Sequence, residues 1–170
     1  MITLNEPENL SACLASGADI AAEIVIVDGG SQDSTVAIAE KFGARVIVNR
    51  DWPGFGVQKN RALAQAREKW VLSLDADERL TLELRDEITR VISQENTAAM
   101  GYEIERRSWF IGQFIKHAWS ADYVLRLCQR EHARFTDDMV HERLIVDGRV
   151  ARLKSVMLHY SYRNYEQVLK

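Results

Sequence analysis

The chain has 170 residues, of which 46% are hydrophobic and 28% are charged, and its net charge is −3. This composition excludes a largely disordered chain, and the acidic balance lacks the basic stripe typical of nucleic-acid-binding proteins. No apolar run approaches the roughly 20 residues that a membrane-spanning helix needs, and no signal peptide opens the sequence. We therefore expect a cytoplasmic protein with two buried free thiols, Cys13 and Cys128, which lie far apart in apolar contexts.

Segments typical of strands and of helices alternate through the first half of the chain. Short apolar runs, rich in β-branched side chains, predict strands at residues 2–4, 23–28, 45–48 and 70–74. Four helices are expected to start at Pro7, at the capping residue Asp33 or Ser34, at an alanine-rich stretch that begins at Val57, and at Thr81. Strands separated by helices predict parallel βαβ units, and hence an α/β fold with a doubly wound, mostly parallel sheet and helices on both faces.

The second half of the chain has a different pattern. Four short segments there alternate or run apolar like strands, at residues 101–106, 123–127, 144–146 and 156–159. The loops between them contain several aromatic side chains. We therefore expect a small, mixed and more open half to follow the parallel half.

Two aspartates, Asp75 and Asp77, directly follow the expected strand at 70–74 in the sequence LSLDADER. Residues two apart in an extended backbone point to the same side, and paired carboxylates suit Mg²⁺ or Mn²⁺ shared with substrate phosphates. Ligands of open α/β sheets also bind beyond the carboxyl ends of the strands. The alternative is that the two carboxylates only cap the next helix, so the pair by itself leaves both interpretations open.

Two glycine-containing segments are further candidates for ligand binding. In VDGGSQDST, Asp28 ends a buried strand and the glycines let a ligand approach the backbone, although a plain strand-to-helix turn explains the same residues. In GFGVQKNRAL, Lys59 and Arg61 lie in the first turns of a helix, where cations oppose the helix dipole unless they bind an anion. Solvated charges are the equal alternative. Neither segment is a dinucleotide fingerprint or a Walker loop.

The chain carries the segments TLNE, VDGGSQDST, GFGVQKNRAL and DADE in this order. Their type and order resemble those of family 2 glycosyltransferases of the GT-A fold. Three later segments are similar to the bacterial subgroup of β-glucosyltransferases that act on the lipopolysaccharide inner core. They are RRSWFIGQFIKHAWSADYVLRL, DDMVHERL and LHYSY. The resemblance implies a single GT-A domain over residues 1–170, with a nucleotide-sugar-binding half to about residue 95 and an acceptor and catalytic half beyond it. The short first strand and the abrupt end predict a chain truncated at both ends.

The resemblance also implies a role for individual residues. Asp77 would hold a divalent ion, Mn²⁺ or Mg²⁺, with His159 as a further metal ligand, although His159 equally fits a core or strand-end histidine. The nucleotide-sugar pocket would be formed by Thr3, Asn5, Glu6, Asp28, Lys59, Arg61 and Asp75.

Inverting members of the family need one general base, which takes the proton of the acceptor hydroxyl as its oxygen attacks the sugar C1. The VHERL segment favours Glu142, with Asp138 or its neighbour Asp137 as the alternative. Many relatives carry a Glu-Asp pair at this position, from which the present chain departs. Glu142 would otherwise be a surface residue paired with Arg143 or Arg126.

The function that the resemblance implies is transfer of a hexose, glucose from UDP-glucose, to a lipopolysaccharide-core or related glycolipid acceptor. Trp119, by ring stacking, and Asp122, by hydrogen bonding, would hold the acceptor sugar, although Trp119 as ordinary core is simpler. The basic stretch from Arg106 to Arg134 fits phosphorylated sugars or peripheral contact with the cytoplasmic membrane face. The alternatives are a polyprenyl-phosphate sugar transferase, a nucleotidyltransferase, or a non-catalytic nucleotide-sugar-binding module.

Overall fold

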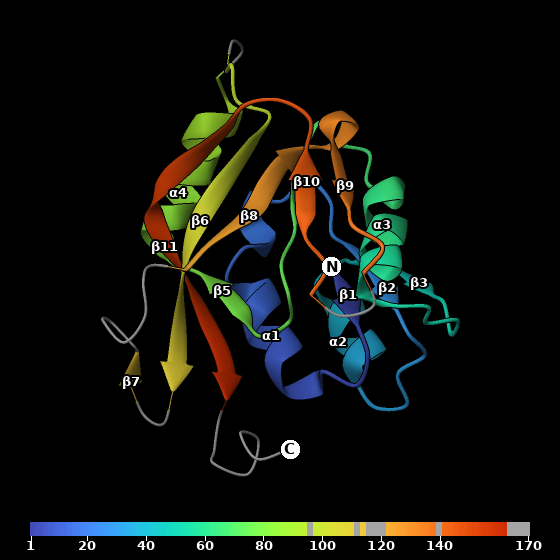
Figure 1. Cartoon of the computed structure of the whole chain (residues 1–170). Helices are drawn as coiled ribbons and strands as arrows, with labels where there is room; N and C mark the ends of the chain where they lie inside the picture. The colour runs from blue at the N-terminus through green and yellow to red at the C-terminus, as the bar shows by residue number, and fades with distance from the viewer. Residues whose placement is uncertain (95–96, 111–112, 115–121, 139–140, 163–170) are drawn as a thin grey trace.

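Figure 1 shows a computed structural model of the chain, described here except at residues 95–96, 111–112, 115–121, 139–140 and 163–170. The first of its sheets is wholly parallel, with the order β1-β2-β3. The strands and their helices are β1 (Ile2–Thr3), α1 (Pro7–Ala15), β2 (Val25–Asp28), α2 (Thr35–Lys41), β3 (Arg45–Val48) and α3 (Phe55–Gln65). A 3₁₀ turn, η1 (Ala18–Ile20), follows α1.

Helices cover both faces of this sheet, as its uninterrupted apolar strands predict. Successive side chains of β2 point to opposite faces. Ile26 packs with Leu10 and Leu14 of α1 and with Ala39 of α2, whereas Val27 packs with Ala62 of α3. Because both faces are buried, the carboxyl edge of the sheet is left for polar residues.

The second sheet is larger and mixed, with the order β4-β8-β6-β11-β5 and with β7 paired to β6. Its strands are β4 (Trp70–Leu72), β5 (Glu78–Leu80), β6 (Gly101–Phe110), β7 (Gln113–Phe114), β8 (Asp122–Gln129) and β11 (Val150–Tyr162). In the part of this sheet that the structure describes, only β6 and β11 pair in parallel. The strand expected at 70–74 therefore joins this sheet, antiparallel to β8, and not the parallel one.

Helix α4 (Leu82–Ile92) covers one face of the second sheet. Thr81 caps it as expected, since its hydroxyl accepts a hydrogen bond from the Leu84 N–H at 3.2 Å. Leu84 and Ile88 pack against the strands with Ile104 and Met157, and all four are almost fully buried. No helix in the described part of the chain is long and apolar enough to cross a membrane.

The two large sheets are separated by an apolar cavity of about 330 Å³. Met1 and Val25 line it from the first sheet, and Trp70 and Leu72 line it from β4. Cys128 of β8 also lines it, and both cysteines are free and buried as expected. Burial raises the pKa of each thiol to about 12, with the charge of Glu78 as a smaller cause at Cys13.

A hairpin of two short strands, β9 (Ala133–Phe135) and β10 (Leu144–Val146), forms a separate antiparallel sheet beside α3. A 3₁₀ turn, η2 (Arg130–His132), leads into it from β8. The sequence pattern predicted β10 but not β9 or β5, because these two three-residue strands contain charged side chains and lack a long apolar run. We call this element, residues 133–146, the base hairpin, because the candidate base Glu142 lies in it.

Candidate functional site

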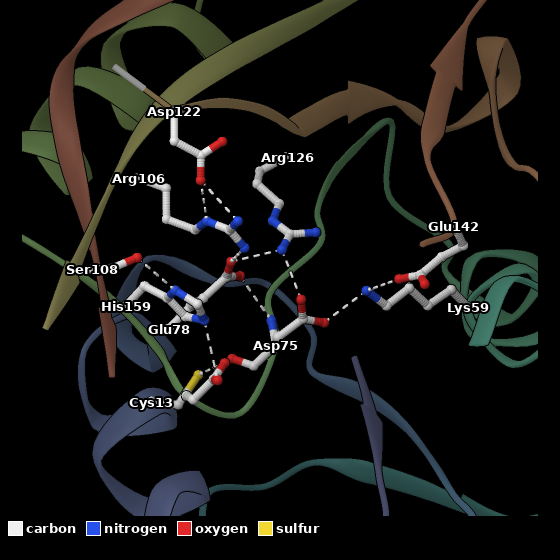
Figure 2. A network of polar contacts seen from close by, with 11 residues as sticks. Cys13, Lys59, Asp75, Glu78, Arg106, Ser108, Asp122, Arg126, Glu142 and His159 are labelled. Atoms are coloured by element: carbon white, nitrogen blue, oxygen red, sulfur yellow. Dashed lines mark hydrogen bonds and ion pairs between the residues drawn. The ribbon is translucent and has the colours of Figure 1, made fainter. Parts of the chain in front are cut away.

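A cluster of charged side chains lies where the loop after β4 meets the second sheet, α3 and the base hairpin (Figure 2). The loop carries Asp75 and Asp77, which directly precede Glu78 of β5. The other members come from distant parts of the chain: Lys59 from α3, Ser108 from β6, Arg126 from β8, Glu142 from the base hairpin and His159 from β11.

Asp75 lies at the centre of this cluster. Its Oδ1 is 2.7 Å from Lys59 Nζ, and its Oδ2 is 2.7 Å from an Arg126 guanidinium nitrogen. Burial opposes ionisation of Asp75, but the charges of Arg126 and Lys59 outweigh it and hold its pKa below the ordinary value. The Cys13 thiol also donates to the Asp75 carbonyl oxygen at 3.4 Å. Asp75 is therefore an ionised and closely oriented carboxylate.

Glu78 and Arg126 form the buried floor of the cluster. Glu78 is fully buried, and its Oε1 accepts a hydrogen bond from Arg126 at 2.6 Å, while its Oε2 accepts one from the Asp75 N–H at 2.9 Å. Burial, together with the charge of Asp75, raises the pKa of Glu78 in spite of Arg126. Asp75 and Glu78 in turn outweigh burial at Arg126 and raise its pKa. Arg126 thus remains a cation that joins β8 to both acidic residues.

The structure brings together the two residues predicted to bind metal. His159 Nε2 lies 3.2 Å from Asp77 Oδ2, and the other ring nitrogen, Nδ1, lies 3.1 Å from the Ser108 hydroxyl. The Tyr160 N–H donates to the Asp77 carbonyl oxygen at 2.9 Å, which fixes the loop against β11. One carboxylate and one imidazole fit a divalent ion such as Mn²⁺.

Further ligands of such an ion would come from a substrate and from water. Within the residues that the structure describes, no group of three or more His, Cys, Asp or Glu side chains has the arrangement of a metal site.

Glu142 faces the cluster and not the solvent. Its Oε1 is 2.6 Å from Lys59 Nζ, and only 13% of its side chain is exposed. Its partner is therefore Lys59, and neither of the arginines considered from the sequence. The preceding residue, His141, has a φ of 68°, a left-handed conformation that is uncommon outside glycine. Asp138, the alternative base, is exposed in the same hairpin, as is Asp137.

Asp28 is placed inside its own turn. It is fully buried, and its oxygens accept hydrogen bonds from the Thr3 hydroxyl, the Gly30 N–H and both the N–H and the hydroxyl of Ser31. Burial opposes ionisation of Asp28, but these bonds outweigh it and lower its pKa. Asn5, with a φ of 54°, donates its N–H to Ser31. Thr3, Asn5 and Asp28 therefore shape a loop, and any contact of theirs with a nucleotide remains a prediction.

Of the other predicted residues, Glu6 and Arg61 are not part of the cluster, whereas Asp122 reaches its rim through Arg106, which lies 3.8 Å from Glu78 (Figure 2). Glu6 is half-buried at the start of α1, and its N–H donates to the Thr35 hydroxyl at 2.9 Å. Arg61 pairs with Asp51 at 2.9 Å. Asp122 is exposed and pairs with Arg106 at 2.8 Å. Trp119 lies outside the described residues.

Sequence reasoning missed Glu78, Arg126 and Ser108 as members of the cluster. Glu78 stands in the quoted LSLDADER segment, directly after the two aspartates. Arg126 interrupts the apolar run YVLRLC in a strand, and a charged residue in such a position has to find a buried partner. That signal could have identified Arg126, whereas Ser108 carried none.

Comparison with known proteins gives consistent matches. The model of glycosyl transferase family 2 matches residues 1–147. An uncharacterised glycosyltransferase of Rickettsia typhi is 30% identical over 99% of this chain and 61% of its own length. The lipopolysaccharide core biosynthesis glycosyltransferase LpsC of Rhizobium meliloti is 32% identical over 100% of this chain and 65% of its own length. The chain thus spans less than two thirds of these relatives.

Two solved structures share the fold. S. aureus TarS 1–349 in complex with UDP-GlcNAc has a TM-score of 0.69 at 16% identity, over 99% of this chain and 59% of that one. Glucosyl-3-phosphoglycerate synthase from Mycobacterium tuberculosis with Mn²⁺ and UDP-glucose has a TM-score of 0.51 at 23% identity, over 62% and 42%. The fold class expected from the sequence is confirmed.

Proposed function

Because the chain belongs to glycosyl transferase family 2 and has the GT-A fold, we propose that it is the catalytic part of an inverting glycosyltransferase that uses a UDP-sugar. The observation that carries the proposal is the meeting of Asp75, Lys59 and Glu142 at the carboxyl end of β4, beside Asp77 and His159. The carboxyl end of β2, which belongs to the parallel sheet, is the edge at which α/β sheets bind ligands.

The donor would bind between the loops that follow β1, β2 and β4. Asp77 and His159 would hold a divalent ion, whose charge would stabilise the leaving diphosphate. The solved complexes of related fold with UDP-GlcNAc, and with Mn²⁺ and UDP-glucose, support a UDP-sugar and Mn²⁺ here. Ser108, at 3.1 Å from His159 Nδ1, would hold the imidazole in the orientation in which Nε2 lies beside Asp77.

Glu142 would be the general base. Its carboxylate takes the proton from an acceptor hydroxyl while the hydroxyl oxygen forms a bond to the sugar C1. The bond from C1 to the diphosphate oxygen breaks on the opposite face, and UDP leaves with the electron pair. Attack opposite to the leaving group inverts the anomeric centre, and the product is a glycoside with UDP.

The proposed donor is UDP-glucose and the proposed acceptor is a lipopolysaccharide-core glycan, the latter supported by the likeness to LpsC. Arg106, which pairs with Asp122 at the rim of the cluster, adds positive charge that suits a phosphorylated acceptor. Contact of the acceptor with Asp122 and Trp119 is part of the same proposal.

A donor screen tests the proposal. Purified protein with Mn²⁺ is offered UDP-sugars and GDP-sugars with a core oligosaccharide acceptor, and release of the nucleoside diphosphate is followed. We expect release from a UDP-hexose that depends on both Mn²⁺ and acceptor. Binding of UDP–Mn²⁺ without transfer of any sugar would instead identify a non-catalytic binding module.

A further inference from the structure

One side chain of α3 binds both main-chain groups of a residue in the base hairpin. The Asn60 amide nitrogen donates to the Phe135 carbonyl oxygen at 2.9 Å, and the Phe135 N–H donates to the Asn60 amide oxygen at 2.8 Å. Phe135 is buried, so these groups would be costly to leave without partners. The Asn60 carboxamide thus forms with Phe135 the pair of main-chain hydrogen bonds that a neighbouring strand would otherwise form.

The same face of α3 contacts the base hairpin at two more positions. A Cβ atom on Gly56 would lie 1.8 Å from the Thr136 carbonyl oxygen, so only glycine allows this approach. Lys59 lies 5.7 Å from the centre of the Phe135 ring and bonds Glu142. Positions 56, 59 and 60 are three and four residues apart and therefore share one side of the helix.

The position of Glu142 depends on this contact through a short chain of bonds. The Thr136 N–H donates to the Arg143 carbonyl oxygen at 2.9 Å, and the Arg143 N–H donates to the Thr136 hydroxyl at 3.0 Å. Thr136 follows Phe135 directly, and Arg143 follows Glu142 directly. Among the described residues, no strand of the two larger sheets pairs with the hairpin, and the side chains of α3 supply hydrogen bonds and an ion pair that hold it.

We propose that Asn60 is a positioning residue of the transfer reaction: it docks the base hairpin on α3 and thereby sets the distance between Glu142 and the donor at Asp75. This inference rests on the proposed function, since it assigns Glu142 the role of base. It gives the GFGVQKN segment a second task, which is to join the two halves of the site.

Asn60→Ala tests the inference. We expect kcat for transfer to fall by about 10- to 100-fold, as a displacement of about 1 Å costs in a positioned reaction, while the Kd of UDP–Mn²⁺ and the donor KM change less than about twofold. Asn60→Asp keeps the acceptor for the Phe135 N–H and loses the donor, so its kcat should lie between those of the wild type and Asn60→Ala. Thr81→Ala, which removes the α4 cap and whose hydroxyl contacts neither α3 nor the base hairpin, is the control for lost stability and should keep kcat.

A double-mutant cycle separates positioning from general stability. If Asn60 acts through Glu142, Asn60→Ala should lower transfer far less in the Glu142→Gln background than in the wild type. Equal factors in both backgrounds, or an unchanged kcat in Asn60→Ala, would overturn the inference.

Hydrogen exchange gives an arm that does not need activity. The Phe135 amide should lose at least about tenfold of its protection in Asn60→Ala while amides of α4 keep theirs. If the wild type transfers no sugar but this loss is seen, the proposed function fails while the docking contact stands. An unchanged Phe135 amide disproves the docking contact itself.

Discussion

Asp28 and Asp75 both lie near the carboxyl end of a strand, β2 and β4 respectively, yet their surroundings differ. Asp28 is closed off by hydroxyl and N–H groups of its own turn and of β1, and no part of it is exposed. Asp75 is bound by two cations, Lys59 and Arg126, that come from α3 and β8. An aspartate satisfied by its own loop shapes that loop, whereas one held by side chains from distant elements marks the place where those elements meet.

We therefore expect changes around Asp75 to affect chemistry or ligand binding, and also stability where they remove the buried cation Arg126. Changes around Asp28 should affect stability alone.

The largest effect is expected for Glu142→Gln, at the acceptor side of the Asp75 cluster. Glutamine keeps the size of the side chain but cannot take a proton, so transfer should fall by about 10³- to 10⁴-fold. Calorimetry should find the affinity for UDP–Mn²⁺ nearly unchanged. Lost UDP binding would mean that Glu142 has a structural role.

Arg126→Met should destabilise the protein most strongly. Methionine leaves Asp75 and Glu78 without their shared buried cation, which costs about 3–5 kcal/mol of unfolding free energy near neutral pH. Protonation removes the uncompensated charges, so the difference from the wild type should shrink as the pH falls. Urea unfolding at several pH values measures this. A variant as stable as the wild type would show that the cluster does not need its arginine.

Asp77→Asn should weaken the binding of UDP in the presence of Mn²⁺ by at least about 100-fold, more than the loss of an outer-shell partner costs. Binding of UDP without the metal should not change, because Asp77 would act only through the ion. Isothermal titration calorimetry with UDP, in the presence and absence of Mn²⁺, measures both affinities. An equal loss in both conditions would place Asp77 in direct contact with the nucleotide.

The smallest effect is expected for Asp28→Asn, which should cost about 1–2 kcal/mol of unfolding free energy and leave UDP affinity within about threefold. Its folded-state pKa lies below the ordinary value, so the carboxylate stabilises the protein above about pH 4 and loses this contribution as the pH falls below that. The difference from the wild type should therefore be constant between pH 5 and 8 and vanish in acid. A large loss of UDP affinity would show instead that Asp28 contacts the nucleotide.

Much of the fold could be predicted because its signals are local. The β-branched runs predicted β2 and β3, and the hydroxyl of Thr81 predicted the start of α4. The proximity of Asp77 to His159 was predicted from the family resemblance alone, because the two residues are 82 positions apart in the sequence and no periodicity links them. The ion pair between Asp75 and Arg126 could not be predicted, since it depends on the register in which Leu72 of β4 faces Leu127 of β8. Such a register follows from tertiary packing and not from either strand alone.

The apolar cavity between β2 and β4 also affects how the molecule opens. Among the described residues, no backbone ladder crosses from the first sheet to the second, so side-chain packing and the polar cluster hold the layers together. Each layer can then exchange its amide hydrogens as a cooperative unit of its own, with an opening free energy below that of the whole molecule. A donor that spans the Asp28 loop and the Asp75 cluster would bind only the closed arrangement, so it would tie the two units together.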